Sequence, residues 1–290
     1  MRNTKEAITI TIPVAVMVPH PPIIIPEIGK GEELKVNSTI LAMTKAMMLI
    51  AEAQPDTVVI ISSHNTMYTD YFHISPGENA YGDFEKFGVK EVSFNVNYDS
   101  DFTSNLTKIA KEENLEAGTE GEIDKRLDHG TMVPLYFLRR AYFGGIPCKI
   151  VRVGLSGMPL VEHYRLGTLI KKTAEKLKKT VCVIGSGDLS HVLKKDGPYG
   201  YKPEGPIYDS RIMDVMERAA FGELLRFSED FNRRASECGH RSFTIMAGCL
   251  DGRSVDARKL SYEGPFGVGY GVCTYLVKGP DLCRRFIAVD

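Results

Sequence analysis

The sequence predicts a single α/β domain with a parallel-rich central sheet and helices on both faces. Three runs, DTVVIISSH (56–64), KIVRVGL (149–155) and TVCVIGSGDLSH (180–191), open with mostly apolar, β-branched residues, as strands buried on both faces of a parallel sheet do. Segments of helical period separate these runs. With 290 residues, 43% of them apolar, the chain can bury one large core.

The first 64 residues are typical of a β-α-β unit. Residues 8–18 alternate and then run apolar up to Pro19, which predicts a strand. Residues 32–53 predict a helix, because apolar side chains recur at spacings of three and four, namely Val36, Ile40, Met43, Met47 and Ile50. The run 56–64 then predicts the second strand of this unit.

The remaining elements continue this alternation. Residues 70–97 are rich in Tyr, Gly and Asn and contain strand-like pieces such as VSFNV (92–96). Helices are predicted near 102–114, 130–142, 160–178 and 240–250, with two helical segments in 206–233 and a closing strand over 270–277. No internal repeat or long linker breaks the pattern, so we expect one domain over residues 1–279 and leave the tail 280–290 unassigned.

Composition restricts the classes of partner. A net charge of −1 offers no basic field for nucleic acid or anionic lipid, and no run of eighteen apolar residues marks a membrane span. We therefore expect small molecules or other proteins as partners, with a homo-oligomer compatible with the sequence. The N-terminus lacks a hydrophobic signal segment, and the six cysteines lie singly, which favours a reducing, cytoplasmic location.

Three of the seven histidines follow predicted strands directly: His20, His64 and His191. Ligands of α/β sheets bind beyond the carboxyl ends of the strands, so the three together favour a metal or catalytic site. Each one alone could equally be a hydrogen-bonded loop residue. His20 stands between Pro19 and Pro21, which stiffen the backbone and suit a metal ligand, although a proline-rich turn is the alternative.

Two further segments could contribute to a site. LDHGTMVPLYFL (127–138) places His129 before an apolar helix, with Asp128 as a candidate N-cap and Gly130 allowing close approach of another group. His129 could donate to an anionic ligand or be a capping-loop residue. ECGHRS (237–242) supplies a carboxylate, a thiol and an imidazole. Two histidines with one carboxylate suit Fe(II), whereas a cysteine favours softer metals.

Other patterns are weaker. GSGDLSH (185–191) lacks the lysine and spacing of a P-loop and the spacing of G-x-S-x-G, so it signals a Ser-His hydrolase only weakly. His73, in a predicted strand, and His163, on a predicted helix, are interpreted as structural or exposed.

The order of PHPP, SSHN, DHG, GSGDLSH, ECGHR and SYEGPFGVGYG resembles the class III, LigB-type, extradiol ring-cleavage dioxygenase superfamily. The resemblance spans about residues 13 to 277. Within the superfamily, the ECG-x-R form and the SYEGPFGVGYG ending are most similar to the LigB-like domain of AmmeMemoRadiSam system proteins, which are related to the Memo proteins. The resemblance implies a LigB-like, phosphorylase/peptidase-like α/β fold.

The resemblance also implies roles for particular residues. His20 and His64 would be two imidazole ligands of a non-haem Fe(II), with Glu237 as the carboxylate ligand. His191 would be the acid–base histidine and His129 a substrate-contacting one. Memo-type relatives have a cysteine where Cys238 stands, so Cys238 is the alternative third ligand, and Zn(II), copper or no metal are the alternatives to iron. Candidate residues that hold these groups in place are Ser186, Asp188 and His240.

The function that the resemblance implies is an Fe(II)-dependent extradiol dioxygenase, which opens a catecholic or aminophenolic ring with O2. One alternative is a Memo-like metal- or ligand-binding protein of the AmmeMemoRadiSam system without ring cleavage. Another is a Zn-dependent hydrolase, which the same histidines could serve.

Overall fold

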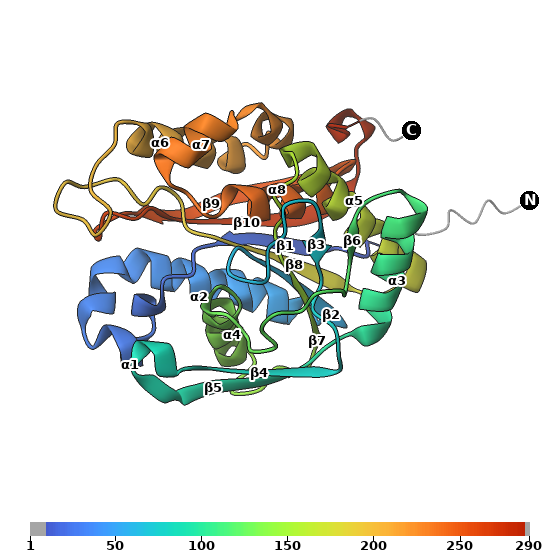
Figure 1. The fold of residues 1–290 in the computed structure, drawn as a ribbon, viewed down its shortest axis with the longest axis horizontal. Coiled ribbons are helices and arrows are strands. Elements are labelled where there is room, and N and C mark those ends of the chain that lie inside the picture. Colours follow the sequence, from blue (N-terminus) through green and yellow to red (C-terminus); the bar gives the residue numbers. More distant parts are fainter. Residues whose placement is uncertain (1–9, 288–290) are drawn as a thin grey trace, which may run out of the picture.

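A computed structural model describes residues 10–287. Its centre is a six-stranded sheet with the strand order β7-β2-β8-β1-β10-β9 (Figure 1). Four neighbouring strands are parallel: β7 (Lys149–Val153), β2 (Thr57–Ser62), β8 (Val181–Ser186) and β1 (Val14–Val18). The two at the other edge, β10 (Tyr270–Pro280) and β9 (Arg253–Glu263), pair antiparallel. The predicted α/β class with a parallel-rich sheet is confirmed.

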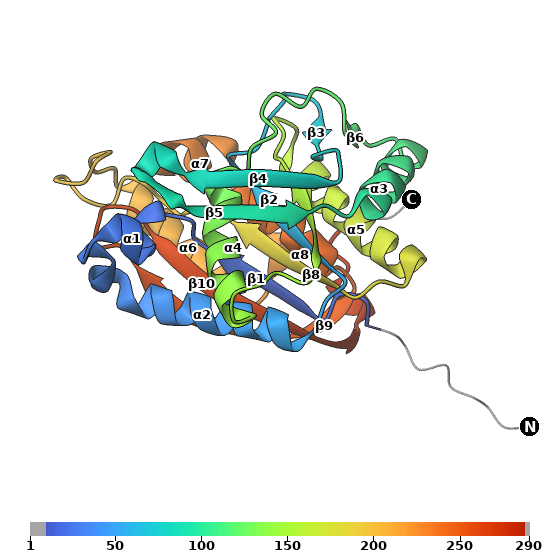
Figure 2. The same cartoon turned by 90° about the horizontal axis from the view of Figure 1, so that it is seen from below.

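Both faces of this sheet are covered. Val14, Val16 and Val18 of β1 belong to one apolar core, which includes residues of α2 (Asn37–Glu52), α4 (His129–Ala141) and the hairpin of β4 (Asn79–Phe84) and β5 (Val89–Asn97). Ala15 and Met17 belong to the other core. That core is built with α3 (Ser100–Glu112), α5 (Leu160–Leu177), α6 (Glu204–Glu217) and α8 (His240–Cys249). Figure 2 shows α2, α4 and the hairpin on one side of the sheet.

Shorter elements connect these layers. They are α1 (Pro26–Gly29), α7 (Glu229–Ala235), the two-residue strands β3 (Phe72–His73) and β6 (Ala117–Gly118), and 3-10 turns at Pro22–Ile24, Glu32–Val36, Glu85–Phe87, Phe221–Arg226 and Leu282–Arg284. The last turn lies in the tail left unassigned from the sequence, and the domain limit at residue 279 stays a prediction.

The structure corrects two predictions made from the sequence. The predicted strand 8–18 is paired only from Val14, and residues 8 and 9 lie outside the described residues. β9 has no counterpart among the predicted elements, because its residues are charged and mostly half-exposed. Such residues are typical of an edge strand, where charge discourages pairing with another chain.

Among the described helices, only Glu32–Glu52 is long and apolar enough to cross a membrane by length and composition. Met43, Met47 and Ile50 of this helix are fully buried in the core of the domain. A core helix of a globular domain passes the same test of length and composition.

The fold brings the loops that follow β1, β2 and β8 to one edge of the sheet, because parallel strands end on the same side. These loops carry His20, His64 and His191. The first turn of α4 and the segment before α8 complete the same edge.

Candidate metal centre

His20 is the best-anchored residue at this edge. It follows β1 and its side chain is 1% exposed. Its backbone N–H donates to Asp188 Oδ1 at 2.9 Å, and its Nδ1 lies 2.9 Å from Ser186 Oγ. Two residues proposed from the sequence to hold the ligands, Ser186 and Asp188, therefore both contact His20.

Ser186 fixes the tautomer of His20. Its Oγ lies 2.6 Å from the carbonyl oxygen of Gly130, which can only accept, so the serine hydroxyl donates there. The remaining contact then requires His20 Nδ1–H to donate to Ser186 Oγ. This leaves Nε2 with a free lone pair, the form in which imidazole binds a metal. Because the Ser186 hydroxyl is buried and engaged in these bonds, it does not support a hydrolase nucleophile.

Replacing Ser186 by alanine is expected to lower the affinity for a divalent metal by about 10–100-fold, since the other tautomer becomes accessible to His20. Isothermal titration with Zn(II) measures the change. Ser190→Ala removes a buried hydroxyl that donates to Ala235 O instead, and this control should keep the affinity within twofold. Equal losses in both variants would contradict the role of Ser186.

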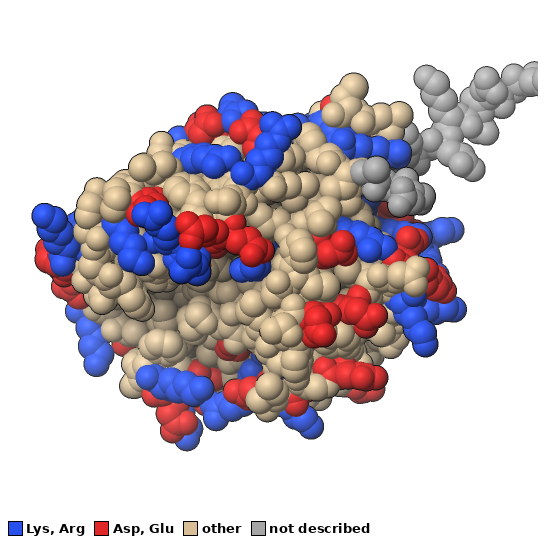
Figure 3. All heavy atoms as spheres, turned by 45° about the horizontal axis from the view of Figure 1, so that its top comes forward, with Lys and Arg blue, Asp and Glu red and all other residues tan. Residues whose placement is uncertain are grey.

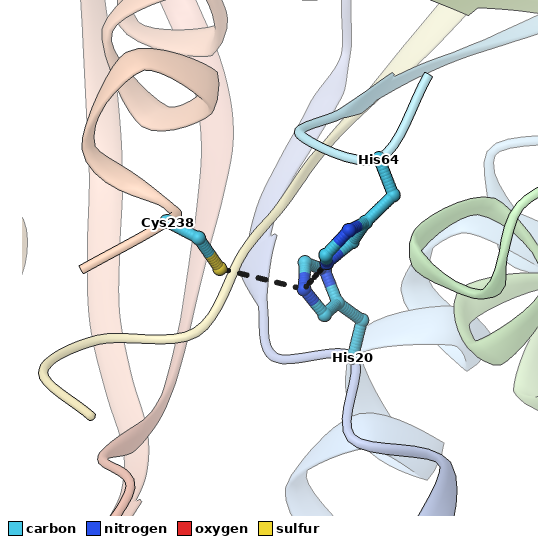
Figure 4. Close-up of side chains that lie close together, drawn as sticks. All are labelled: His20, His64 and Cys238. Carbon is cyan, nitrogen blue, oxygen red and sulfur yellow. Dashed lines mark hydrogen bonds between the residues drawn. The ribbon is translucent and has the colours of Figure 1, made fainter. Parts of the chain in front are cut away.

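His64 and Cys238 face the free nitrogen of His20 (Figure 4). His64 Nε2 lies 3.1 Å from His20 Nε2, and Cys238 Sγ lies 3.5 Å from the same atom. One ligand atom of each of the three residues lies within 4.8 Å of the others. Two imidazole nitrogens and a sulfur at these separations can bind one metal ion.

Cys238 reaches the histidines because two backbone segments nearly touch. A Cβ on Gly187 would lie 2.1 Å from the Cα of Gly239, so glycine is required at this crossing. The approach lets Asp188 N–H donate to Cys238 Sγ at 3.2 Å. Burial raises the pKa of the Cys238 thiol, so without metal it keeps its proton and it would lose that proton on metal binding.

Glu237, the other third-ligand candidate, lies elsewhere. Its Oε2 accepts from the backbone N–H of His240 at 2.6 Å, at the start of α8. It lines a separate pocket with Asn232 and Arg241, and burial raises its pKa to about 7. The structure therefore brings together His20, His64 and Cys238, and it does not bring Glu237 to them.

Three histidines, His73, His163 and His240, lie away from the cluster of His20, His64 and Cys238 and are structural. His240 Nε2–H donates to Leu224 O at 3.0 Å, and its Nδ1 accepts from the Tyr208 hydroxyl at 3.1 Å. Its ring therefore does not hold the proposed ligands in place. His73 and His163 are fully buried, with Nδ1 3.0 Å from Glu120 O and 3.1 Å from Pro159 O. The structural interpretation of both is confirmed, and the exposed alternative is wrong.

His129 lies directly beside this cluster. It is the first residue of α4, and Asp128 caps that helix by accepting from Thr131 N–H at 3.0 Å, as the sequence predicts. The His129 ring centroid lies 3.9 Å from that of His64. Burial lowers the pKa of His129 to about 4, so the ring is neutral near pH 7.

His191 approaches the cluster from the loop after β8. Its Nδ1 lies 2.6 Å from Ser236 O, which can only accept, so Nδ1 carries the proton and Nε2 is free to take one. Burial lowers the pKa of His191 below the usual 6.5. A neutral ring with a free Nε2 can act as a general base.

Arg152 supports the segment that carries His129, and the sequence did not predict it. Its side chain is 1% exposed and donates to Ser75 Oγ at 2.7 Å and to Arg126 O at 2.6 Å. Its guanidinium lies 3.3 Å from Glu122 and 3.7 Å from Asp128. The arginine inside the apolar run KIVRVGL could have indicated this network, since a buried arginine requires partners.

A cleft of about 680 Å³ opens onto the cluster. His20, His64, His129 and His191 line it, together with aromatic side chains that include Phe87, Phe266 and Tyr270. Asp188 and Lys194 are among its charged residues. On the molecular face drawn in Figure 3, basic and acidic side chains are interspersed. The size and the aromatic walls suit a small organic ligand.

Comparisons with known proteins bear on this cleft. A family model described as the catalytic LigB subunit of aromatic ring-opening dioxygenase matches residues 14–273. Protein CA_C1420 of Clostridium acetobutylicum is 36% identical over an alignment of 263 residues, which covers 88% of this chain. The chain spans only 56% of the length of that relative. A crystal structure of the uncharacterized protein JW3007 from Escherichia coli K12 matches with a TM-score of 0.54 and 13% identity, over 90% of this chain and 98% of that one. This likeness shows a shared fold.

Proposed function

Because this chain belongs to the family of the catalytic LigB subunit of aromatic ring-opening dioxygenases, we propose that it is a metal-dependent dioxygenase that opens the ring of a small catecholic or aminophenolic compound with O2. The reaction would break a ring C–C bond beside an oxygenated carbon and leave both atoms of O2 in the product. The observation that carries the proposal is the convergence of His20, His64, His129 and His191 on one cleft.

The ligand atoms of the site indicate which metals fit it. Imidazole suits iron, zinc and copper, and a thiolate shifts the preference toward softer metals than a carboxylate does. Three protein ligands, His20, His64 and Cys238, leave positions open for a substrate. We propose that these residues hold one divalent metal, with iron for the dioxygenase role and zinc or copper as alternatives. A metal bound there would lower the pKa of a phenol beside it.

His191 and His129 would handle the proton and the substrate oxygens. His191 has its Nε2 free because Nδ1–H donates to Ser236 O, so it can accept the proton of a phenol hydroxyl. His129 is neutral near pH 7 because burial lowers its pKa, and one of its ring nitrogens can donate to a substrate oxygen. Pro21 and Pro22 beside His20, with Phe87, give the cleft apolar surface for the ring.

Replacing His191 by alanine is expected to lower kcat for oxygen uptake by about 10²–10⁴-fold, the usual contribution of a general base. Metal content should remain that of the wild type, because His191 is not in the ligand group. An oxygen electrode measures the uptake by the iron-loaded wild type and by the iron-loaded variant with a panel of catechols and aminophenols. Unchanged uptake in His191→Ala would contradict its role. Copper or no metal together with no uptake in the wild type would contradict the proposed activity.

One observation favours a second function. The third donor beside the two histidines is a thiol, whereas two histidines and one carboxylate form the usual non-haem Fe(II) site. We therefore hold a metal- or ligand-binding role without ring cleavage, as in Memo-like proteins of the AmmeMemoRadiSam system, as the alternative. Stoichiometric binding of a metal without oxygen uptake for any phenol in the panel would favour it.

The proposal includes a cytoplasmic location. All six cysteines are free thiols in the structure, and Cys148, Cys182, Cys249 and Cys273 are buried. Unpaired cysteines are typical of proteins in reducing compartments.

A further inference from the structure

Tyr270 is a buried tyrosine that the fold places at the cleft. It is the first residue of β10, and β10 pairs antiparallel with β1 so that Met17 lies opposite Cys273. Tyr270 and His20 both line the cleft. The preceding Gly269 is bonded in both directions to the loop that carries His191: its N–H donates to Ser190 O at 2.8 Å, and its carbonyl accepts from Leu189 at 2.9 Å.

The hydroxyl of Tyr270 is the unusual part of the residue. The side chain is 3% exposed and packs in the apolar core that contains Val268 and Val272. Tyr270 also lines the cleft. Its oxygen is not one of the fully buried side-chain atoms that lack a partner, so the hydroxyl is reached from the cleft that Tyr270 lines.

Among the residues that the structure describes, none forms a hydrogen bond with the Tyr270 hydroxyl. Other buried tyrosines are paired internally: Tyr164 donates to Asp251 at 2.8 Å and Tyr275 donates to Met216 O at 2.9 Å. Tyr98 lacks a partner too, but its hydroxyl is sealed in the core. A hydroxyl that opens onto the cleft with no protein partner is available to bond a ligand there.

Tyr270 can serve such a ligand as a donor. Burial and the nearby Asp188 raise its pKa above 10, so it keeps its proton at ordinary pH. His191 offers the opposite function, an acceptor nitrogen, in the same cleft. A donor and an acceptor in one cleft are complementary to a ring with two neighbouring oxygens, one of which gives up its proton.

We infer that Tyr270 is a substrate-binding residue whose hydroxyl donates a hydrogen bond to a ring oxygen of the phenolic substrate. This inference rests on the proposed function. Lys194 is the alternative donor, but it is exposed and its Nζ already donates to Pro265 O at 2.8 Å.

The variant Tyr270→Phe removes only the hydroxyl, which has no partner to lose in the structure, so the fold should be unaffected. We expect the dissociation constant of 4-nitrocatechol to rise about tenfold or more, as for loss of one hydrogen bond to a charged oxygen. Absorbance of the bound ligand measures it with the iron-loaded protein under anaerobic conditions. The KM of a catechol that is turned over should rise by a similar factor, with the metal content and the Tm of the ligand-free protein unchanged.

The matched control is Tyr201→Phe. Tyr201 lies on the loop after His191, is 47% exposed and does not line the cleft, so affinity should stay within twofold. An unchanged dissociation constant in Tyr270→Phe would overturn the inference, and so would weaker binding accompanied by a lower Tm or loss of metal. Failure of the wild type to bind 4-nitrocatechol would instead contradict the proposed function.

Discussion

Replacing His20 by alanine is expected to lower the affinity for a divalent metal by more than about 100-fold and to abolish oxygen uptake. The loss should exceed the 10–100-fold that is typical of a residue that only holds a ligand. His20 Nε2 is the atom that both other donors approach, at 3.1 Å from His64 and 3.5 Å from Cys238. Without it, two donors remain. Equilibrium dialysis with metal analysis measures the change.

His163→Gln is the matched control for His20→Ala. His163 is equally buried, and its Nδ1 lies 3.1 Å from Pro159 O, away from the cluster. Its loss should lower stability and leave the metal stoichiometry intact. If His20→Ala retained wild-type affinity, or if both variants lost metal equally, the assignment of His20 as a ligand would be wrong.

The second large effect is on the stability of the fold. Arg152→Met is expected to lower the free energy of unfolding by about 3–5 kcal/mol, the usual cost of removing one partner of a buried ion pair. The change leaves Glu122 and Asp128, with side chains 8% and 11% exposed, without their cation. It also leaves the carbonyls of Arg126 and Asp124 without the donor that they accept from. Urea unfolding followed by circular dichroism measures the loss.

Arg258→Met is the control for this change. Arg258 pairs with Asp256 at 3.1 Å on the exposed β9, with side chains 60% and 33% exposed. Such surface pairs contribute about 0–1 kcal/mol, so the expected loss is small. A similar small loss for Arg152→Met would show that the buried network does not stabilise the 122–128 segment.

The strand-end histidines could be predicted from the sequence because two simple rules combine. Continuous apolar runs mark parallel strands, and parallel strands end at one edge of the sheet. His20, His64 and His191 follow such runs, and the structure places all three on one cleft. The N-cap role of Asp128 could likewise be predicted, because it depends on local backbone geometry alone.

The residue that faces the two histidines from the segment before α8 could not be predicted by the same rules. Glu237 and Cys238 are neighbours in the chain, and which one faces the histidines depends on the start of α8 and on the Gly187–Gly239 crossing. That crossing joins segments about fifty residues apart, so no local pattern reveals it. The strand β9 was not predicted, for a different reason. Its charged, half-exposed residues lack the apolar alternation that predicts a strand.

X-ray absorption spectroscopy on the zinc-loaded protein identifies the ligand atoms of the ion. We expect one sulfur at about 2.3 Å together with two imidazole nitrogens at about 2.0–2.1 Å. The sulfur signal should disappear in Cys238→Ser and persist in Glu237→Gln. A shell of nitrogen and oxygen alone, changed by Glu237→Gln and not by Cys238→Ser, would contradict the site of His20, His64 and Cys238.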